Sequence, residues 1–153
     1  MTEPLRHDHP GDALYLDVAL RNVLEVPVLG IPTRFESNSA AALELLDEWF
    51  GSWRALAASP ELISPPGVRV RLVVHEGDEG ERSPAPIAWR IPDSDHILVH
   101  TPGSHGMADI PRREAIAYVT PALIGDLPQL LHDLVHGLTL RSEERRVGKE
   151  CRL

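Results

Sequence analysis

Hydrophobic residues in this chain recur with two different periods, and each period predicts a type of secondary structure. Val68–Val74 alternates apolar and basic residues, which indicates a strand with one buried face. A helix is predicted over about residues 39–57, because apolar side chains recur there at three- and four-residue steps: Leu43, Leu46, Phe50, Trp53 and Ala57. Asn38 and Ser39 precede this helix, and both residue types commonly cap helix N-termini.

Five further segments have the composition of short strands. They are Leu14–Val28, Thr33–Glu36, Ile87–Ile91, His96–Thr101 and Glu114–Thr120. The last of these could also form a helix, although a strand is favoured. Turn-forming residues separate the first two at Gly30–Pro32, and residues 92–95 are expected to join the next two as a hairpin. Gly103–Pro111 is rich in turn-forming residues, so we expect a loop there.

A second main helix is predicted over residues 127–140, with Asp126 and Pro128 suited to its first turn. Its large apolar side chains fall within about 140° of arc at 100° per residue: Leu127, Leu130, Leu131, Leu134, Val135 and Leu138. The opposite arc carries His132, His136 and Thr139. We expect part of the stripe to stay exposed and to cause self-association through Leu127, Leu130, Leu131, Leu134 and Leu138. The alternative is that this helix packs wholly on the sheet of its own chain.

Together these elements predict an α+β fold with a small antiparallel or mixed sheet and two main helices. Residues 1–12 are expected to be a flexible terminus, and residues 13–140 to form one α+β domain. The only Lys and the only Cys of the chain, Lys149 and Cys151, lie in the last thirteen residues. Arg141–Cys151 resembles the translation of a common sequencing-library adapter. We therefore interpret residues 141–153 as a non-native tail and expect the natural protein to continue beyond residue 140.

Composition and charge narrow the classes of function. The 153 residues include 15 Lys and Arg against 23 Asp and Glu, a formal net charge of −8. Nucleic acids and anionic membranes attract clustered positive charge, so neither is an expected partner. The chain contains no run of 18 apolar residues, so no membrane-spanning helix is predicted.

His132 and His136 are the strongest candidates for metal chemistry. Their spacing places two imidazoles one helical turn apart, as in the zinc-protease motif His-Glu-x-x-His. Asp133 stands where that motif has its general-base Glu, and its side chain is one methylene shorter. A small zinc-dependent hydrolase using this helix is one alternative function. Because no nearby third ligand is evident, we expect two solvent-facing histidines rather than a metal site.

Three other groups of side chains have simple structural explanations. His96 and His100 are expected on one strand face about 13 Å apart, at 3.3 Å per residue, which is too far for one metal ion. His105 lies in a glycine-flanked segment, where a plain turn is expected rather than an anion site. Arg69 and Arg71 project from one strand face. They would suit a stand-alone binding module for an acidic ligand, although a solvent-exposed sheet face is the simpler interpretation.

Two stretches of the chain resemble a known group of proteins. The first is Leu29–Ser39, followed by a helix with Phe50-Gly51-Ser52-Trp53, and the second is Pro86–Arg90 together with Val99–Ser104. They are similar to the N-terminal region of uncharacterised bacterial proteins related to HPr kinase. The resemblance implies a small α+β domain that precedes a P-loop domain in a cytoplasmic protein. ATP and Mg²⁺ would be the cofactors of that P-loop domain.

The leading hypothesis is therefore a truncated N-terminal accessory domain of an HPr-kinase-like ATP-binding protein, with no activity of its own. Its main partner would be the missing C-terminal P-loop domain. The P-loop signature, which ends in Gly-Lys-Ser/Thr, would lie downstream of Leu140. No catalytic, cofactor-binding or metal residue is assigned in this chain, and its status as an enzyme stays open.

Overall fold

The computed structural model of the chain describes residues 17–56, 67–75, 88–126, 128–132 and 134–139. The expected flexible terminus over residues 1–12 and the tail over residues 141–153 lie outside the described residues, as do Leu127 and Asp133. None of the described helices is long and apolar enough to cross a membrane.

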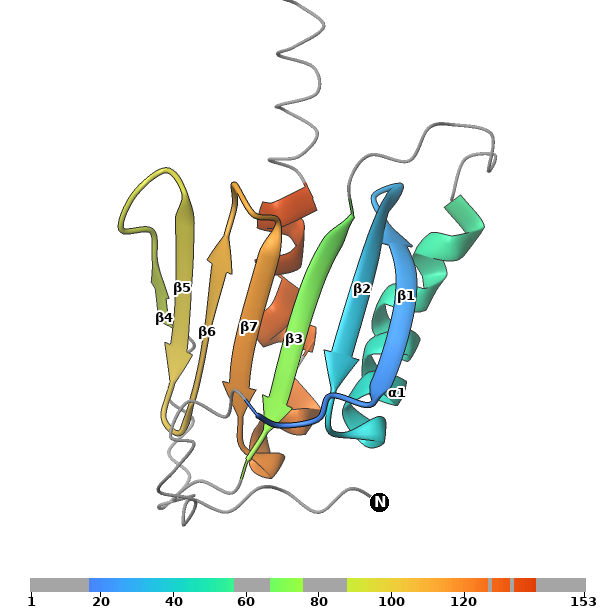
Figure 1. The fold of residues 1–153 in the computed structure, drawn as a ribbon, viewed down its shortest axis with the longest axis horizontal. Helices are drawn as coiled ribbons and strands as arrows, with labels where there is room; N and C mark the ends of the chain where they lie inside the picture. Colours follow the sequence, from blue (N-terminus) through green and yellow to red (C-terminus); the bar gives the residue numbers. More distant parts are fainter. Residues whose placement is uncertain (1–16, 57–66, 76–87, 127, 133, 140–153) are drawn as a thin grey trace, which may run out of the picture.

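Seven strands form one mixed sheet in the spatial order β1-β2-β3-β7-β6-β5-β4 (Figure 1). The strands are β1 (Asn22–Val28), β2 (Ile31–Ser37), β3 (Val68–Val74), β4 (Ala88–Arg90), β5 (His96–Thr101), β6 (Ser104–Asp109) and β7 (Glu114–Val119). β2, β3 and β7 run parallel to one another, and every other neighbouring pair is antiparallel. Together with the two helices behind it, this sheet confirms the α+β class.

The alternation of apolar and polar residues predicted most of these strands. β3 spans the predicted Val68–Val74, and β4 pairs with β5 as the expected antiparallel hairpin. β1 begins at Asn22 rather than at residue 14, and residues 14–16 are not described. Asn22 is opposite Ser37, the last residue of β2, so the described residues before Asn22 have no β2 residue opposite them.

The prediction of a loop over Gly103–Pro111 was wrong, because Ser104–Asp109 forms the interior strand β6. Its inward-facing positions carry the small residues Ser104, Gly106 and Ala108, all of them buried. A Cβ built on Gly106 would lie 3.0 Å from Leu134 Cδ1 and 3.2 Å from Val99 Cγ1. Small residues in this strand therefore leave space for a helix, whereas in the sequence they have the composition of a turn.

The first predicted helix is shorter than expected. α1 spans Ala40–Phe50, and residues 51–56 continue as the 3-10 helix η1 (Gly51–Leu56). Ser39 is the N-cap, as predicted, and its Oγ accepts a hydrogen bond from the Ala42 amide at 3.3 Å. The change to a tighter helix at Gly51 agrees with the low α-helix propensity of glycine.

The second predicted helix follows a short 3-10 helix, η2 (Pro121–Asp126). Residues 128–132 and 134–139 are helical, and we call them the C-terminal helix. The expectation that part of its apolar stripe stays exposed was wrong for the described leucines, which are fully buried: Leu130, Leu131, Leu134 and Leu138. Thr139, which the sequence places on the arc opposite the apolar stripe, is also buried and is not exposed to solvent. Its hydroxyl donates to the Val135 carbonyl at 3.0 Å.

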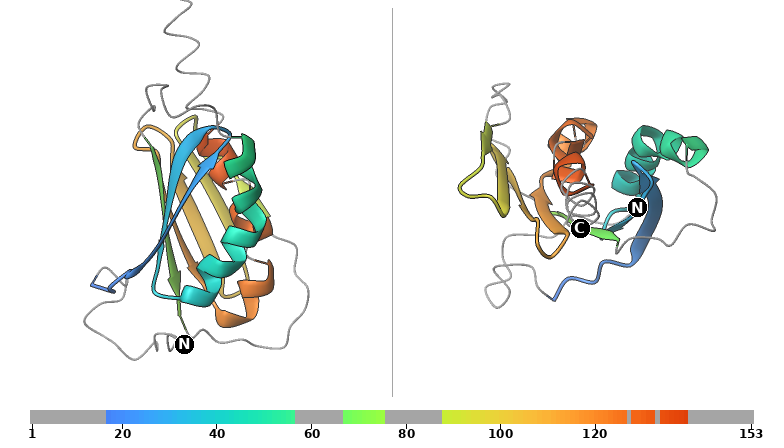
Figure 2. Two further views of the ribbon diagram at one scale, coloured as in Figure 1. Left: turned by 90° about the vertical axis from the view of Figure 1, so that its right-hand side faces the viewer. Right: turned by 90° about the horizontal axis from the view of Figure 1, so that it is seen from above.

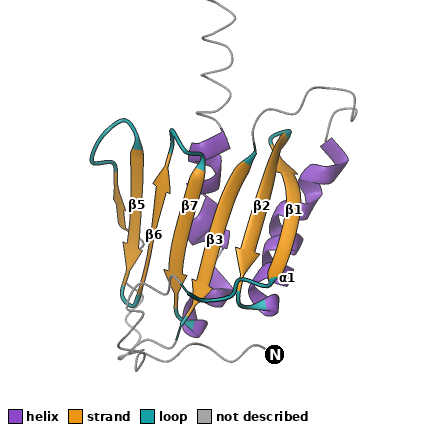
Figure 3. Ribbon diagram, in the orientation of Figure 1, coloured by secondary structure: helices purple, strands orange, loops and turns teal. Residues whose placement is uncertain are grey.

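The domain has two layers, with the described helices on one side of the sheet only. Figure 2 shows α1 and the C-terminal helix on the same side of the sheet, and Figure 3 shows both of them behind the strands. α1 contacts β1 and β2, and Leu134 of the C-terminal helix lies close to β6 at Gly106. The hydrophobic core fills the space between these layers. We call the opposite side of the sheet the helix-free face.

Replacing Leu130 and Leu134 together by serine should unfold the domain. Each truncation removes a fully buried side chain at a cost of about 2–5 kcal/mol, against a typical total stability of about 5–15 kcal/mol. Circular dichroism and size-exclusion chromatography report the outcome, with the exposed Gln129 and His132 of the same helix as control positions for a matched double variant. A folded and more soluble Leu130→Ser/Leu134→Ser protein would contradict this packing.

Candidate functional site

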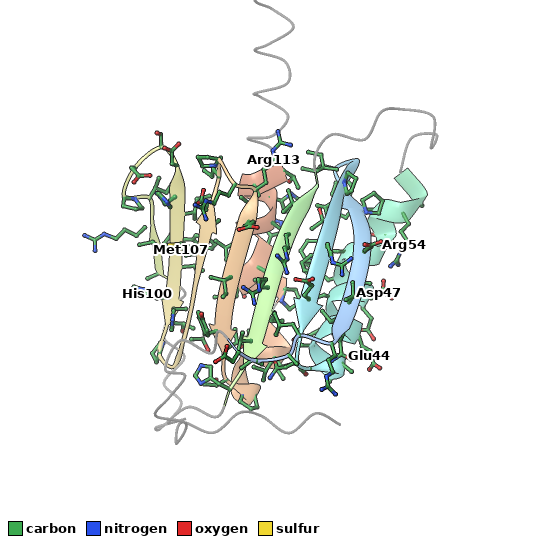
Figure 4. All side chains as sticks on the ribbon, in the orientation of Figure 1. Glu44, Asp47, Arg54, His100, Met107 and Arg113 are labelled. Carbon is green, nitrogen blue, oxygen red and sulfur yellow. The ribbon has the colours of Figure 1, made fainter. Side chains whose placement is uncertain are left out.

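The helix-free face is lined by alternate residues of the seven strands, because successive side chains in a strand point to opposite faces. On β4 these residues are Ala88 and Arg90, which lie opposite His100 and Leu98. The strand register aligns these residues in three rows that cross the sheet. The charged row consists of His96, Asp109, Glu114, Arg69, Arg34 and Glu25. The mainly apolar row consists of Leu98, Met107, Ile116, Arg71, Glu36 and Val23. The partly aromatic row consists of His100, His105, Tyr118 and Val73. In Figure 4 this face is toward the viewer, and Met107 and His100 are labelled on it.

Glu36 is the centre of the charged part of this face. Its side chain is only 11% exposed, and it accepts hydrogen bonds from Arg69 Nε at 2.6 Å and Arg34 Nε at 3.1 Å. Burial of the carboxyl group acts to raise its pKa, but the hydrogen bonds and charges of the two arginines outweigh burial and lower the pKa below its ordinary value. Arg34 also binds Glu25 at 3.1 Å. These residues therefore form an ion-pair network around one nearly buried carboxylate.

A hollow of about 480 Å³ lies beside this network, at the ends of β1, β2 and β3. It is lined by Glu25, Val26, Pro27, Pro32, Thr33, Arg34, Gly67, Val68 and Arg69. Both of its arginines are already paired with glutamates. An anion in this hollow would therefore have to compete with carboxylates that are held in place.

Arg71 differs from the neighbouring Arg69, although both lie on the same face of β3 as the sequence predicts. Its Nε is buried and has no hydrogen-bond partner among the described residues. Glu36 is opposite Arg71 in the register of β2 and β3, but its two oxygens are bonded to Arg34 and Arg69. Arg71 thus has unused hydrogen-bonding capacity in the described part of the chain, and the exposed Arg90 of β4 is a further cation on this face.

His132 and His136 are adjacent, as the helical spacing predicts, with ring centroids 4.3 Å apart. The expectation that both face solvent was wrong for His136, which is half-buried between the two helices. The centroid of its ring lies 6.4 Å from that of Phe50 and 6.1 Å from that of Trp53, so one side of the imidazole packs against these aromatic rings. Within the described residues, no group of three or more His, Cys, Asp or Glu side chains is placed to hold a metal ion.

The other candidate histidines lie on β5 and β6. His96 and His100 share one strand face, as expected, and His96 Nδ1 contacts Asp93 Oδ1 at 2.9 Å. His105 does not lie in a loop, since it belongs to β6 and its ring stacks on Tyr118 at a centroid distance of 5.1 Å. The hydrogen bond with Asp93 and nearby carboxylate charges raise the pKa of His96 above its ordinary value.

A band of buried polar residues follows the carboxyl ends of the parallel strands, where open α/β sheets commonly bind ligands. Asn38 lies after β2, and its side chain donates to the Val74 carbonyl at 2.9 Å and accepts from the Val74 amide at 2.8 Å. Ser104 Oγ accepts from the Thr120 amide, after β7, at 3.1 Å. These two side chains connect backbone segments, so at this edge they hold the fold together.

Sequence reasoning missed the central position of Glu36. A signal was present, because alternation within Thr33–Glu36 places Arg34 and Glu36 on one strand face. The contact with Arg69 depends on the parallel pairing of β2 with β3, two strands separated by a helix in the chain.

No protein-family model, curated protein sequence or solved structure matches this chain. The relation to HPr-kinase-related proteins therefore stays a prediction. The α+β class is established by the sheet and helices described above.

Replacing Glu36 by Gln should lower the free energy of unfolding by about 1–2 kcal/mol at pH 7. Hydrogen bonds to charged groups contribute about 1.5–3 kcal/mol, and the half-exposed arginines reduce that value. Because the folded-state pKa is lowered, this contribution is present above the unfolded pKa near 4.5 and is lost as pH falls through the folded value. Urea unfolding of the wild type and Glu36→Gln at several pH values from 7 to 3 measures this difference in the free energy of unfolding.

The exposed Glu25 provides the matched control, since it also pairs with Arg34 but has a 70% exposed side chain. Glu25→Gln should change stability by no more than about 0.5 kcal/mol. Equal effects of Glu25→Gln and Glu36→Gln would contradict the central position of Glu36.

Replacing Asp93 by Asn should return the pKa of His96 toward its ordinary value, as measured by NMR titration of the imidazole. The raised pKa means that this ion pair stabilises the fold below the unfolded pKa of about 6.5 and is lost as pH rises through the folded value. The stability difference between wild type and Asp93→Asn should therefore be larger at pH 5 than at pH 8. Asp109→Asn is the control, because Asp109 Oδ2 lies 4.0 Å from His96 Nε2. An unchanged His96 pKa in Asp93→Asn would refute the contact.

Proposed function

We propose that residues 13–140 form a non-catalytic accessory domain of an HPr-kinase-like protein, in which a P-loop domain binds ATP and Mg²⁺. The proposal is supported by what the residues of the resemblance do in the fold. Those that the structure describes form strands, turns, a helix cap and connections between backbone segments. Pro32, Thr33 and Arg34 of the first stretch line the 480 Å³ hollow, and no described residue of the second stretch does.

The first stretch, Leu29–Ser39, forms a turn, a strand and a helix cap. Leu29 and Gly30 both have positive φ, 52° and 76°, and the Gly30 amide donates to the Pro27 carbonyl at 3.2 Å. Such a turn favours glycine at its second position, because a Cβ is strained there. At the other end of the stretch, Ser39 caps α1, and Asn38 connects the β2–α1 junction to the end of β3.

The described part of the second stretch is Ala88–Arg90, which forms β4, together with Val99–Ser104, which contributes to β5 and to the turn into β6. Ser104 ends this stretch and accepts the hydrogen bond from the Thr120 amide. Both stretches thus connect backbone segments at the carboxyl ends of the parallel strands. Two polar side chains at the edge where a ligand is usually bound, Asn38 and Ser104, are engaged with the backbone, and this observation supports the proposal of a non-catalytic domain.

In isothermal titration calorimetry, the chain should bind no Mg·ATP at micromolar nucleotide concentrations, because the phosphate-binding loop belongs to the other domain. The parent protein, expressed from the uninterrupted gene, is the positive control. Its reading frame should encode Gly-x-x-x-x-Gly-Lys-Ser/Thr after a predicted strand beyond residue 140. Tight Mg·ATP binding by this chain, or a native frame that lacks the motif, would refute the proposal.

A further inference from the structure

An apolar band crosses the helix-free face from β5 to β7 and ends at Arg71. Leu98 is opposite Met107, Met107 is opposite Ile116, and Ile116 is opposite Arg71 in the registers of four neighbouring strands. Met107 is 42% exposed, and Leu98 and Ile116 are half-buried. No described helix covers these side chains (Figure 2).

Arg71 supplies a cation at the end of this band. Its buried Nε has no acceptor among the described residues, and the oxygens of the nearest register partner, Glu36, are held by two other arginines. A guanidinium has five N–H donors in a planar arrangement, which matches the two oxygens of a carboxylate. A carboxylate on a partner would therefore complement Arg71, beside an apolar surface.

The shape of this region favours a protein segment over a small molecule. The 480 Å³ hollow is lined by Arg34 and Arg69 and does not include Arg71 or the apolar band. Small ligands bind mainly in concave sites, whereas an extended surface with Arg, Met and Tyr is typical of protein interfaces. Tyr118 lies in the neighbouring row of the same face, two residues after Ile116 on β7.

We propose that the helix-free face docks a protein segment that carries an Asp or Glu side chain between large apolar side chains. The carboxylate would bond to Arg71, and the apolar side chains would cover Leu98, Met107 and Ile116. This inference goes beyond the accessory-domain proposal and does not depend on an ATP-binding partner, because it rests on the described face alone.

The first test is the stability of the chain without a partner. Arg71→Met removes a guanidinium whose buried donor is unsatisfied, so it should raise Tm by about 2–6 °C. Arg69→Met is the matched control on the same strand face, and it should lower Tm because it leaves Glu36 with one arginine. A lower Tm for Arg71→Met would show that the arginine supports the fold of the isolated chain, and would overturn the proposal.

The second test is peptide selection. Random twelve-residue peptides displayed on phage are selected on the wild-type chain and counter-selected on Arg71→Met. Enriched sequences should contain Asp or Glu flanked by large apolar residues. A synthetic peptide of that sequence should bind at least about tenfold more weakly after Asp→Asn or Glu→Gln substitution, or when Arg71 is replaced by Met. Arg112→Met, which changes a 78% exposed arginine in a turn, should leave binding unchanged.

Three results would overturn the proposal. They are the absence of enrichment over the counter-selection, enriched peptides that lack an acidic residue, and peptides that bind Arg71→Met as tightly as wild type. Sedimentation of the wild-type chain should show a monomer. A dimer that is lost in Arg71→Met would assign the face to a second copy of this chain and would also overturn the proposal. Failure of Arg71→Met to fold would overturn the proposal for the same reason as a lower Tm.

Discussion

The close packing of the C-terminal helix on β6 determines how the rest of the domain is arranged. Leu134 lies over Gly106, and the neighbouring inward positions of the sheet carry small side chains such as Ala108 and Ala117. Together with this pairing of large helix residues and small strand residues, the described leucines of the stripe are completely buried: Leu130, Leu131, Leu134 and Leu138. α1 covers the adjacent strands β1 and β2, so the two helices together cover one side of the sheet.

Packing both helices on one side leaves the other side to polar and partly exposed residues. A charged carboxylate is retained there at low exposure because two arginines donate to it, and the buried Nε of the neighbouring Arg71 has no hydrogen-bond partner in the described part of the chain. Parallel strands are usually covered on both faces, and β2, β3 and β7 here have a described helix on one face only. The helix-free face is therefore the part of the domain where a partner surface has most to contribute.

Local patterns predicted those elements whose side chains alternate or recur clearly. β3, the β4–β5 hairpin, the Ser39 cap and the C-terminal helix follow directly from such patterns. β6 was missed because its small residues fit a helix that is distant in sequence, and small residues alone resemble a turn. The position of His136 against Phe50 and Trp53, and that of Glu36 between two arginines, depend on tertiary contacts that local periodicity does not encode.

The contact between Leu134 and Gly106 tests the one-sided packing most directly. In a ¹³C-edited NOESY spectrum of the chain, the account predicts strong cross-peaks between the Leu134 δ-methyl groups and the Gly106 α-protons, and weaker ones to the Val99 γ-methyl groups. Leu134 methyl cross-peaks to Met107 or Ile116 side chains in place of Gly106 would put the helix on the opposite face of the sheet and contradict the account.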